Sequence, residues 1–582
     1  MSMRITNKMM TSNTNTNINN NKVSVDRLNT QVSTQKKISR PSEDPVVAIR
    51  ALRLRSSLNE ISQYYEKNIP DAKSWLEVTE SALKTTQGAI EDMYEYCVQG
   101  SSDELTATDR AKVLANLKEL KSQVYSAGNA DYAGRTVFTG YRTGESLTYG
   151  KDTAQNFSIT EGFNAADIDT IKYVSGKVDV NNIAATDPTD NEVHRIRLSY
   201  DEMDATTTPH EIEYKTPLAD ATSSKTATGF TITTTPTPGG TATTYTITQN
   251  ADGTYTSSAG SFVKNEDGTF TLTEGITKNA DGSHTMTAGN VTVNLTSTGA
   301  VQNFYTTSSI EVVSKTLAGD GDSAYVVNEP ADANKAYYIA ETGEMILGST
   351  AYNTLSNLKN IEGTDVIGFT YDKGQWSKGD LRPEHYFNCV DTTDALNPIN
   401  HVYSEQIIAY DVSANQNLRV NTLAGEVYDH DITRDIDEMI NATQAVIDAE
   451  DKITKLKAMQ SDSQYDETQQ ATIASMLEEA EKEKTLLQDK MENLFKSNIT
   501  NSQEYLDQTN LAIANCGARG TSLTLTTTRM KEQQTSVNQL ASENENVDVA
   551  TAAIDLANAE LAYDAALLAA GKISQQTLLN YL

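Results

Sequence analysis

Apolar residues recur every seven positions near the start of the chain, a spacing that places them on one face of a helix. The first repeat consists of Ile18, Val25 and Val32, with Leu28 between them. A second, sharper repeat consists of Ile69, Leu76, Leu83, Ile90 and Cys97. The first segment is otherwise rich in Asn, Thr and Ser, which are mediocre helix formers. We therefore expect its helix to need a partner face.

The segment Arg40-Pro41-Ser42-Glu43-Asp44-Pro45 separates these two repeats. Asp44 is a suitable N-cap and Pro45 suits the first helical position, so one helix is expected to end and another to begin here. Pro70, inside the second repeat, predicts a kink or a helix start. A third helix is expected from about Thr108, with Val113, Leu117, Leu120 and Val124 on one face. Glycines 128–144 then introduce turns.

The C-terminal part repeats the heptad pattern and contains no proline after residue 430. Two helical segments are predicted there, from Ile432, Met439, Val446 and Ile453 and from Ile473, Ala480, Leu487 and Leu494. Near the end, Leu523, Met530 and Val537 share one register, which then steps by three residues to Leu540, Val547, Ile554, Leu561 and Leu568. The step predicts a stammer that overwinds a coiled coil. Each Leu or Ile buried in this seam would contribute roughly 1.5–3 kcal/mol.

The middle of the chain is rich in Thr, Gly, Asp and Tyr, which favours strands and turns. Three Asn-x-Asp-Gly segments begin at Asn250, Asn265 and Asn279, each between short Thr and aromatic stretches. Asp-Gly supplies the positive φ of tight turns, so successive β-hairpins are expected. A calcium-binding repeat is the alternative, but its glycine-rich nonapeptide pattern is missing.

These patterns predict an α+β fold. Long paired N- and C-terminal helices would form a coiled-coil-like core, with a large β-rich outer region inserted between them. The expected parts are residues 1–144, 145–430 with a hairpin insertion at about 225–300, and 431–582.

Composition excludes several classes of function. The net charge of −32 argues against binding nucleic acid or an anionic membrane surface, both of which need excess Lys and Arg. No apolar run is long enough for a transmembrane helix, and no apolar signal segment follows the N-terminus. The cysteines Cys97, Cys389 and Cys516 lack metal-ligand spacing. Cys97 and Cys516 fall in helical patterns and are expected to be buried apolar residues.

Catalytic and cofactor motifs are missing from the sequence, so we predict no catalytic residue, cofactor or metal and a structural role in place of an enzymatic one. Asp429-His430-Asp431 could ligate a metal ion. It borders a predicted helix start, however, where acidic residues favour the positive end of the helix dipole, and we interpret it as a cap.

Both ends of the chain resemble the bacterial flagellin family, and within it the hook-associated proteins of the hook–filament junction. The N-terminal resemblance is carried by Ile38 to Pro45, with Pro41, Ser42, Asp44 and Pro45, and by the segment containing Gly134, Arg135, Phe138 and Gly140. Filament-forming flagellins usually lack the proline pair, which favours the junction branch. The C-terminal resemblance runs from Val547 to Leu579. Together, the two resemblances cover about residues 1–144 and 497–582 and leave out residues 145–496.

The resemblance implies a protein exported unfolded through the flagellar type III channel without a cleaved signal peptide. Outside the cell, it would form a ring of its own copies at the hook–filament junction, between the first hook-associated protein and flagellin. A cytoplasmic export chaperone would hold the C-terminal helix beforehand. No nucleic acid, membrane or cofactor is implied. The heptad residues named above would then form the assembly interface.

Two alternatives stay open from the sequence. The chain could be a flagellin that forms the filament itself. Its β-rich region could instead act as an adhesin or a carbohydrate-active domain, although no pair of catalytic carboxylates is evident.

Overall fold

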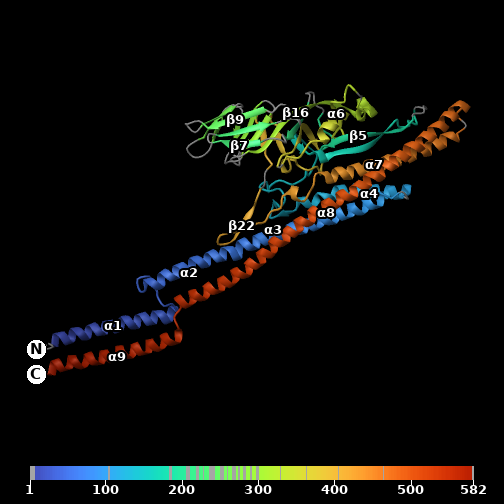
Figure 1. The fold of residues 1–582 in the computed structure, drawn as a ribbon. Coiled ribbons are helices and arrows are strands. Elements are labelled where there is room, and N and C mark those ends of the chain that lie inside the picture. Colours follow the sequence, from blue (N-terminus) through green and yellow to red (C-terminus); the bar gives the residue numbers. More distant parts are fainter. Residues whose placement is uncertain are drawn as a thin grey trace. The chain divides into compact units, whose positions relative to one another are not determined.

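Figure 1 shows the fold of the chain in a computed structural model. The structure describes residues 7–579 except for short segments, namely 103–104, 182–186, 205–209, 218–221, 227–228, 235–242, 250–253, 258–259, 265–269, 273–275, 279–283, 289–290, 296–300, 328–329, 362, 404–405 and 463. Long helices from both ends of the chain accompany a large β-sheet region, which confirms the predicted α+β class.

The chain divides into two compact units. Unit 1 consists of Met1–Glu77, Ile408–Val420 and Asn515–Leu582, and unit 2 consists of Val78–Ile407 and Asn421–Ala514. Helices α3 (Ile69–Gly100) and α8 (Glu467–Glu545) contribute residues to both. No helix in the described ranges is both long and apolar enough to cross a lipid bilayer.

Unit 1 is built mainly from the two ends of the chain. Its complete elements are α1 (Asn7–Thr34), α2 (Pro45–Gln63), the π-helical turn η1 (Tyr64–Asn68), the hairpin of β22 (Ala409–Ser413) and β23 (Gln416–Arg419), and α9 (Val549–Leu579). Helices α1 and α9 lie side by side and run antiparallel, so both termini lie at one end of the pair (Figure 1).

The start of α2 follows the sequence expectation. Asp44 accepts hydrogen bonds from the backbone N–H groups of Val46 and Val47, at 2.9 and 3.1 Å, and Pro45 is the first helical residue. Pro70 offers no N–H to the preceding turn, and the π turn η1 lies directly before α3. The predicted irregularity at Pro70 is therefore a π turn between two helices.

The predicted continuous seam from Leu540 to Leu568 is wrong, because the helix ends at Glu545 and a new one begins at Val549. The backbone at this break pairs with the segment after α1: Lys37 N–H donates to Glu545 O and Val547 N–H to Gln35 O. Asp548 then caps α9 by accepting from Ala550 and Thr551. The register step at Leu540 thus precedes a helix break and does not overwind a continuous coil.

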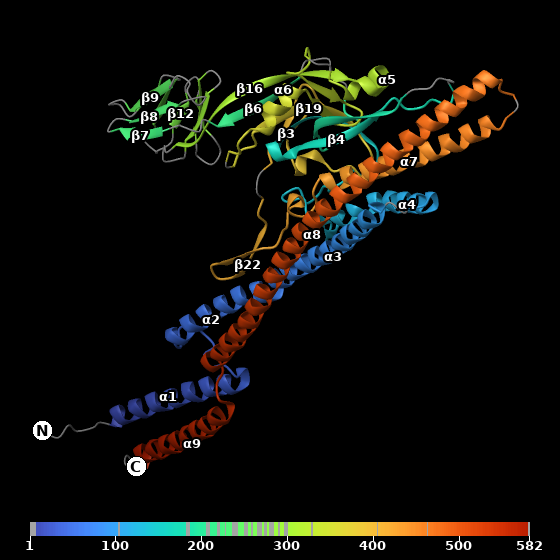
Figure 2. The same ribbon diagram turned by 45° about the vertical axis from the view of Figure 1, so that its right-hand side comes forward.

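Unit 2 holds α4 (Ala107–Val124), α5 (Leu317–Asp320), α6 (Ser349–Ser356), α7 (Asp431–Gln460) and most of the β structure (Figure 2). Helix α4 packs against α7 and buries Val113, Leu117, Leu120 and Val124, the face predicted for the third helix. The strands preceding α5 are β1 (Asp131–Tyr132), β2 (Arg135–Thr136), β3 (Thr153–Phe163), β4 (Ile168–Ser175), β5 (Thr189–Arg197), β6 (His210–Pro217), β7 (Thr222–Thr226), β8 (Gly229–Thr234), β9 (Thr243–Gln249), β10 (Thr254–Ser257), β11 (Gly260–Lys264), β12 (Phe270–Leu272), β13 (Ile276–Lys278), β14 (His284–Ala288), β15 (Val291–Leu295) and β16 (Val301–Lys315). The strands following it are β17 (Ala336–Ile339), β18 (Glu344–Leu347), β19 (Ile367–Trp376), β20 (Asn388–Asp391) and β21 (Ile399–His401).

The main sheet has the order β21-β20-β3-β19-β6-β16-β17-β18-β5-β4, with β13–β15 joined to it through β16. A second sheet has the order β12-β11-β10-β9-β8-β7. The three Asn-x-Asp-Gly turns predicted from the sequence lie outside the described residues. The strands that flank them do pair antiparallel, as hairpins require: β9 with β10, β11 with β12, and β13 with β14.

Two glycines of the family-like segment have a backbone that other residues rarely adopt. Gly134 has φ +76° in the turn between β1 and β2, and its N–H donates to Asp131. Gly140 has φ +61°, and a Cβ there would lie 2.2 Å from Oε1 of Gln406. Between them, the buried Phe138 ring meets Tyr428 edge-on, with centroids 5.2 Å apart. The segment therefore packs as part of the unit 2 core.

Close packing at the end of α3 gives a testable prediction. A Cβ on Gly100 would lie 2.3 Å from the fully buried ring of Phe495. We expect Gly100→Ala to lower the free energy of unfolding by about 1–3 kcal/mol through overpacking. Gly88, in the same helix, has no atom within 4 Å of its Cβ position, so Gly88→Ala should be neutral or stabilise by up to about 1 kcal/mol. The free energies of unfolding of both variants can be measured in urea. Equal changes for Gly100→Ala and Gly88→Ala would contradict this packing.

Candidate functional site

The pair of terminal helices in unit 1 is the first candidate site. Predicted residues Ile18, Val25, Leu28 and Val32 of α1 are all partly buried. On α9, the buried or partly buried positions alternate by four and three residues, and are Ala552, Leu556, Ala559, Tyr563, Ala566 and Ala570. Asn21 also donates to the backbone carbonyl of Ala562, at 3.2 Å. Four of these six residues are alanines, which allow close helix approach, and Leu556 and Tyr563 lie between them.

Three other apolar residues of α9 lie outside that seam. Ile554, Leu561 and Leu568 are 63%, 70% and 70% exposed. Because they are seven residues apart, they form a stripe along one face of the helix. We call these three residues the α9 stripe. Leu540, at the end of α8, is half exposed, and Val547 lies partly buried in the connector before α9.

Helix α2 carries a second exposed apolar group, which sequence reasoning missed. Val46, Ile49 and Leu52 are three residues apart, and each is more than half exposed. Their spacing of three residues is visible in the sequence and indicates one face of a helix. Single exposed leucines are ordinary on protein surfaces, whereas aligned ones mark a contact surface.

The sharpest predicted heptad repeat, on α3, is buried inside the chain. Ile69, Leu76, Leu83 and Ile90 are all at most 4% exposed. They stabilise the chain itself and offer no surface to a second copy. Cys97, in the same register, is fully buried, and burial raises the pKa of its thiol to about 12. Cys97 and Cys516 are buried, as predicted, and so is Cys389; none of the three forms a disulfide.

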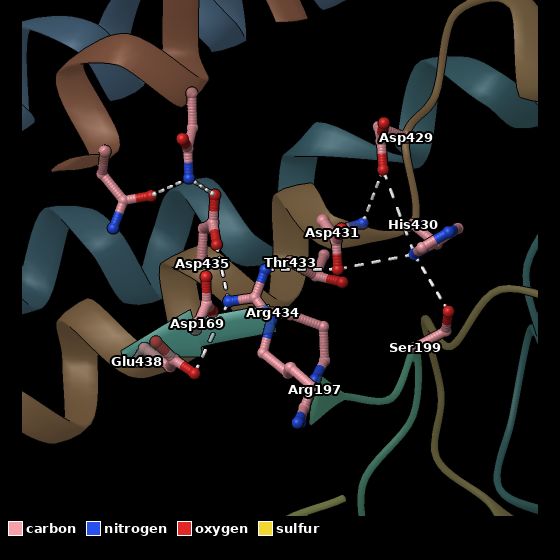
Figure 3. A network of polar contacts seen from close by, with 12 residues as sticks. Asp169, Arg197, Ser199, Asp429, His430, Asp431, Thr433, Arg434, Asp435 and Glu438 are labelled. Carbon is pink, nitrogen blue, oxygen red and sulfur yellow. Dashed lines mark hydrogen bonds and ion pairs between the residues drawn. The ribbon is translucent and has the colours of Figure 1, made fainter. Parts of the chain in front are cut away.

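A second candidate site lies in unit 2, where the first turns of α7 meet the sheet (Figure 3). Asp431, Asp435 and Glu438 lie on one face of α7, and Arg197, the last residue of β5, reaches all three. The Arg197 nitrogens lie 3.2, 2.6 and 3.5 Å from these carboxylates, in the same order. The spacing of four and three residues on a helix allows one guanidinium to contact all of them.

Arg195, two residues earlier on β5, joins the same network. It pairs with Glu344 of β18, with Glu438 at 2.7 Å and with Asp169 at 3.5 Å, and its side chain is 5% exposed. Burial alone would raise the pKa of Glu438, but Arg195 and Arg197 hold it at about 2. These residues line a cavity of about 1140 Å³. Charges of opposite sign compensate one another here, so the arrangement is suited to holding α7 on the sheet.

The Asp429-His430-Asp431 cluster also belongs to this network. The Asp431 N–H donates to Asp429 Oδ1 at 2.9 Å, so Asp429 satisfies the first N–H of α7, whereas the N-cap residue His430 makes no side-chain cap hydrogen bond. His430 Nδ1 lies 2.9 Å from Ser199 Oγ and 3.5 Å from Asp431 (Figure 3). Although burial acts in the opposite direction, Asp431 and Asp429 raise the pKa of His430 to about 9. A protonated imidazole is a partner for carboxylates and a poor metal ligand.

The raised pKa of His430 predicts a pH dependence of stability. Its pKa is 6.5 when unperturbed and about 9 in the folded chain, so its stabilising contribution is complete below pH 6.5 and is lost between pH 6.5 and 9. Because the ring is 31% exposed, solvent screening should limit this to about 1 kcal/mol. The difference in free energy of unfolding between the parent and His430→Gln should therefore shrink from pH 6 to pH 9. If the free energies of unfolding of the parent and His430→Gln differ by the same amount at every pH, His430 carries no such contribution.

Comparison with known proteins gives a match over the N-terminal quarter of the chain. Residues 5–143 match the bacterial flagellin N-terminal helical region. Over 143 residues the chain is 32% identical to flagellar hook-associated protein 3 of Salmonella typhimurium and, to the same extent, of Escherichia coli. Each match covers 24% of this chain and 44% of the relative, so the chain spans less than half the length of these relatives. A flagellin of Clostridium tyrobutyricum is 24% identical over 184 residues, covering 29% of this chain and 48% of that protein.

Solved structures of two FlgL proteins align with this chain. A crystal structure of FlgL from Xanthomonas campestris aligns with 84% of this chain and 99% of its own, at 14% identity and a TM-score of 0.26. The flagellar junction protein FlgL from Legionella pneumophila aligns with 86% of this chain and 100% of its own, at 10% identity and a TM-score of 0.26. The family match ends at residue 143, and the expected resemblance of the C-terminal helix stays a prediction.

Proposed function

We propose that this chain, whose residues 5–143 match the bacterial flagellin N-terminal helical region, is a structural subunit of the flagellum at the hook–filament junction. Two hook-associated proteins 3 share 32% identity with its N-terminal part, which supports the junction above other flagellar positions. The proline pair Pro41 and Pro45 supports the same choice. In this role, residues 1–144 and 431–582 would supply the assembly core and residues 145–430 the outer region.

The α9 stripe is the observation that carries the assembly role. A Leu fully removed from water contributes roughly 1.5–3 kcal/mol, and Ile554, Leu561 and Leu568 remain largely in water although the helix is already paired with α1. An exposed stripe at heptad spacing is suited to a further helix. We infer that copies of this chain supply that helix when they assemble into a ring.

The neighbours on either side would be the first hook-associated protein and flagellin. Before assembly, an export chaperone would cover the C-terminal helix, including the same stripe. The chain would leave the cell and remain on the flagellum outside.

A filament-forming flagellin is the second candidate, and the identity with the Clostridium tyrobutyricum flagellin supports it. Immunogold labelling of flagella with an antibody to this chain separates the two. A junction protein gives one labelled band where hook meets filament. Labelling along the filament, or assembly of the pure chain into long filaments, would instead establish it as flagellin.

A further inference from the structure

Two turns far apart in the sequence bring three potential metal ligands together in unit 2. Glu145 lies just after the glycine-rich segment, and Glu384 and His385 form a short turn (Pro383–His385) after β19. One donor atom from each residue lies within 4.8 Å of the other two. Two carboxylates and an imidazole form a set of ligands that suits a divalent transition metal.

Two donor atoms of this cluster are buried without a partner. Among the residues that the structure describes, Glu384 Oε2 and His385 Nε2 have no hydrogen-bond partner, and both residues are 8% exposed. Leaving a buried polar group unpaired is costly, so native structures rarely do so. An ion between them would remove the cost for both.

Contacts on the opposite atoms hold these two side chains in place. The Ser146 backbone lies within hydrogen-bonding reach of the His385 imidazole, whose Nε2 has no partner. Metal-binding histidines are commonly oriented this way through their second nitrogen. Glu384 Oε1 pairs with Arg382 at 3.3 Å, which leaves Oε2 available.

The Asp429-His430-Asp431 cluster differs, because its histidine has hydrogen-bonding and ion-pair partners within the chain. His430 Nδ1 is engaged by Ser199 and Asp431, as described above.

Arg142 and Arg382 lie beside the cluster of Glu145, Glu384 and His385, with Arg142 donating to the Glu384 carbonyl at 3.3 Å. Their charge weakens the attraction for a cation, so we expect looser binding than at a four-ligand zinc site.

We propose that Glu145, Glu384 and His385 bind one divalent transition-metal ion, of which Zn²⁺ is the probe of choice, with water completing its coordination. The ion would link two turns of unit 2 that are more than 200 residues apart in the sequence. It would thereby stabilise the folded chain by mass action.

Equilibrium dialysis of the full chain against Zn²⁺ tests the site, with the shift of thermal unfolding as a second readout. The parent chain should bind one Zn²⁺ and unfold at a higher temperature with it. Glu145→Gln and His385→Gln should each lower the affinity at least about tenfold. The matched controls Glu95→Gln, at an exposed site on α3, and His430→Gln should leave it unchanged.

Glu145 is exposed, so its variant should fold even if the buried His385→Gln variant does not. Circular dichroism establishes which variants are folded, and Glu145→Gln alone then decides the outcome. The proposal would be overturned by a parent chain that binds no Zn²⁺, or by a folded Glu145→Gln variant that binds it as tightly as the parent. None of these outcomes depends on the flagellar role.

Discussion

Replacing Leu561 with Asp should leave the isolated chain folded and abolish its assembly. The side chain is 70% exposed on α9, so the free energy of unfolding should change by no more than about 0.5 kcal/mol. In an assembly, the loss of a buried Leu removes roughly 1.5–3 kcal/mol per contact and weakens association about 10- to 100-fold. A carboxylate in the same place adds a desolvation cost. Cells that carry only this variant should be non-motile, and swimming assays with electron microscopy measure this.

Leu396→Asp is the matched control, because Leu396 is 90% exposed but belongs to unit 2 and not to the terminal helices. The same chemical change there should leave motility intact. Leu568→Asp should repeat the Leu561 result, since both residues belong to the α9 stripe. Normal swimming by the Leu561 and Leu568 variants would show that this face has no part in assembly.

Replacing Arg195 with Met should strongly destabilise unit 2. The change leaves the buried Glu344 and the partly buried Glu438 without their shared cation. Removing one partner of a buried ion pair costs about 3–5 kcal/mol because the remaining charge stays buried. Urea unfolding followed by the fluorescence of Trp376, in a Trp75→Phe background, reports this loss from within unit 2.

Two comparisons isolate the cause of that loss. Lys172→Met breaks the exposed pair with Asp190 and should cost less than about 1 kcal/mol. The double variant Arg195→Met with Glu344→Gln should recover part of the stability, because it removes the charge left unpaired. If the double variant is as unstable as the sum of the single ones, the ion pair is not the source of the effect.

Local sequence signals predicted local structure well. Asp44 and Pro45 predicted the start of α2, because a cap depends on residues within one turn of each other. The face of α4 and the hydrogen bond from the Asp431 N–H to Asp429 follow from similarly short distances in the sequence. Heptad spacing also predicted which residues of α9 share a face.

The same spacing did not predict what each face contacts. Counting hydrophobic residues favoured Leu561 and Leu568 for the seam, yet α1 packs on the alanine-rich face, where small side chains allow close approach. The clusters around Arg195 and around His385 were not predictable either. Their members lie on different strands and turns, so they form only after the sheet has paired.

Deleting the gene in a flagellated source strain tests the junction role most directly. Electron microscopy should show hooks without filaments, and flagellin should accumulate in the medium, because filament growth has no junction on which to begin. Filaments of normal length and number on the deletion strain would contradict the role proposed here.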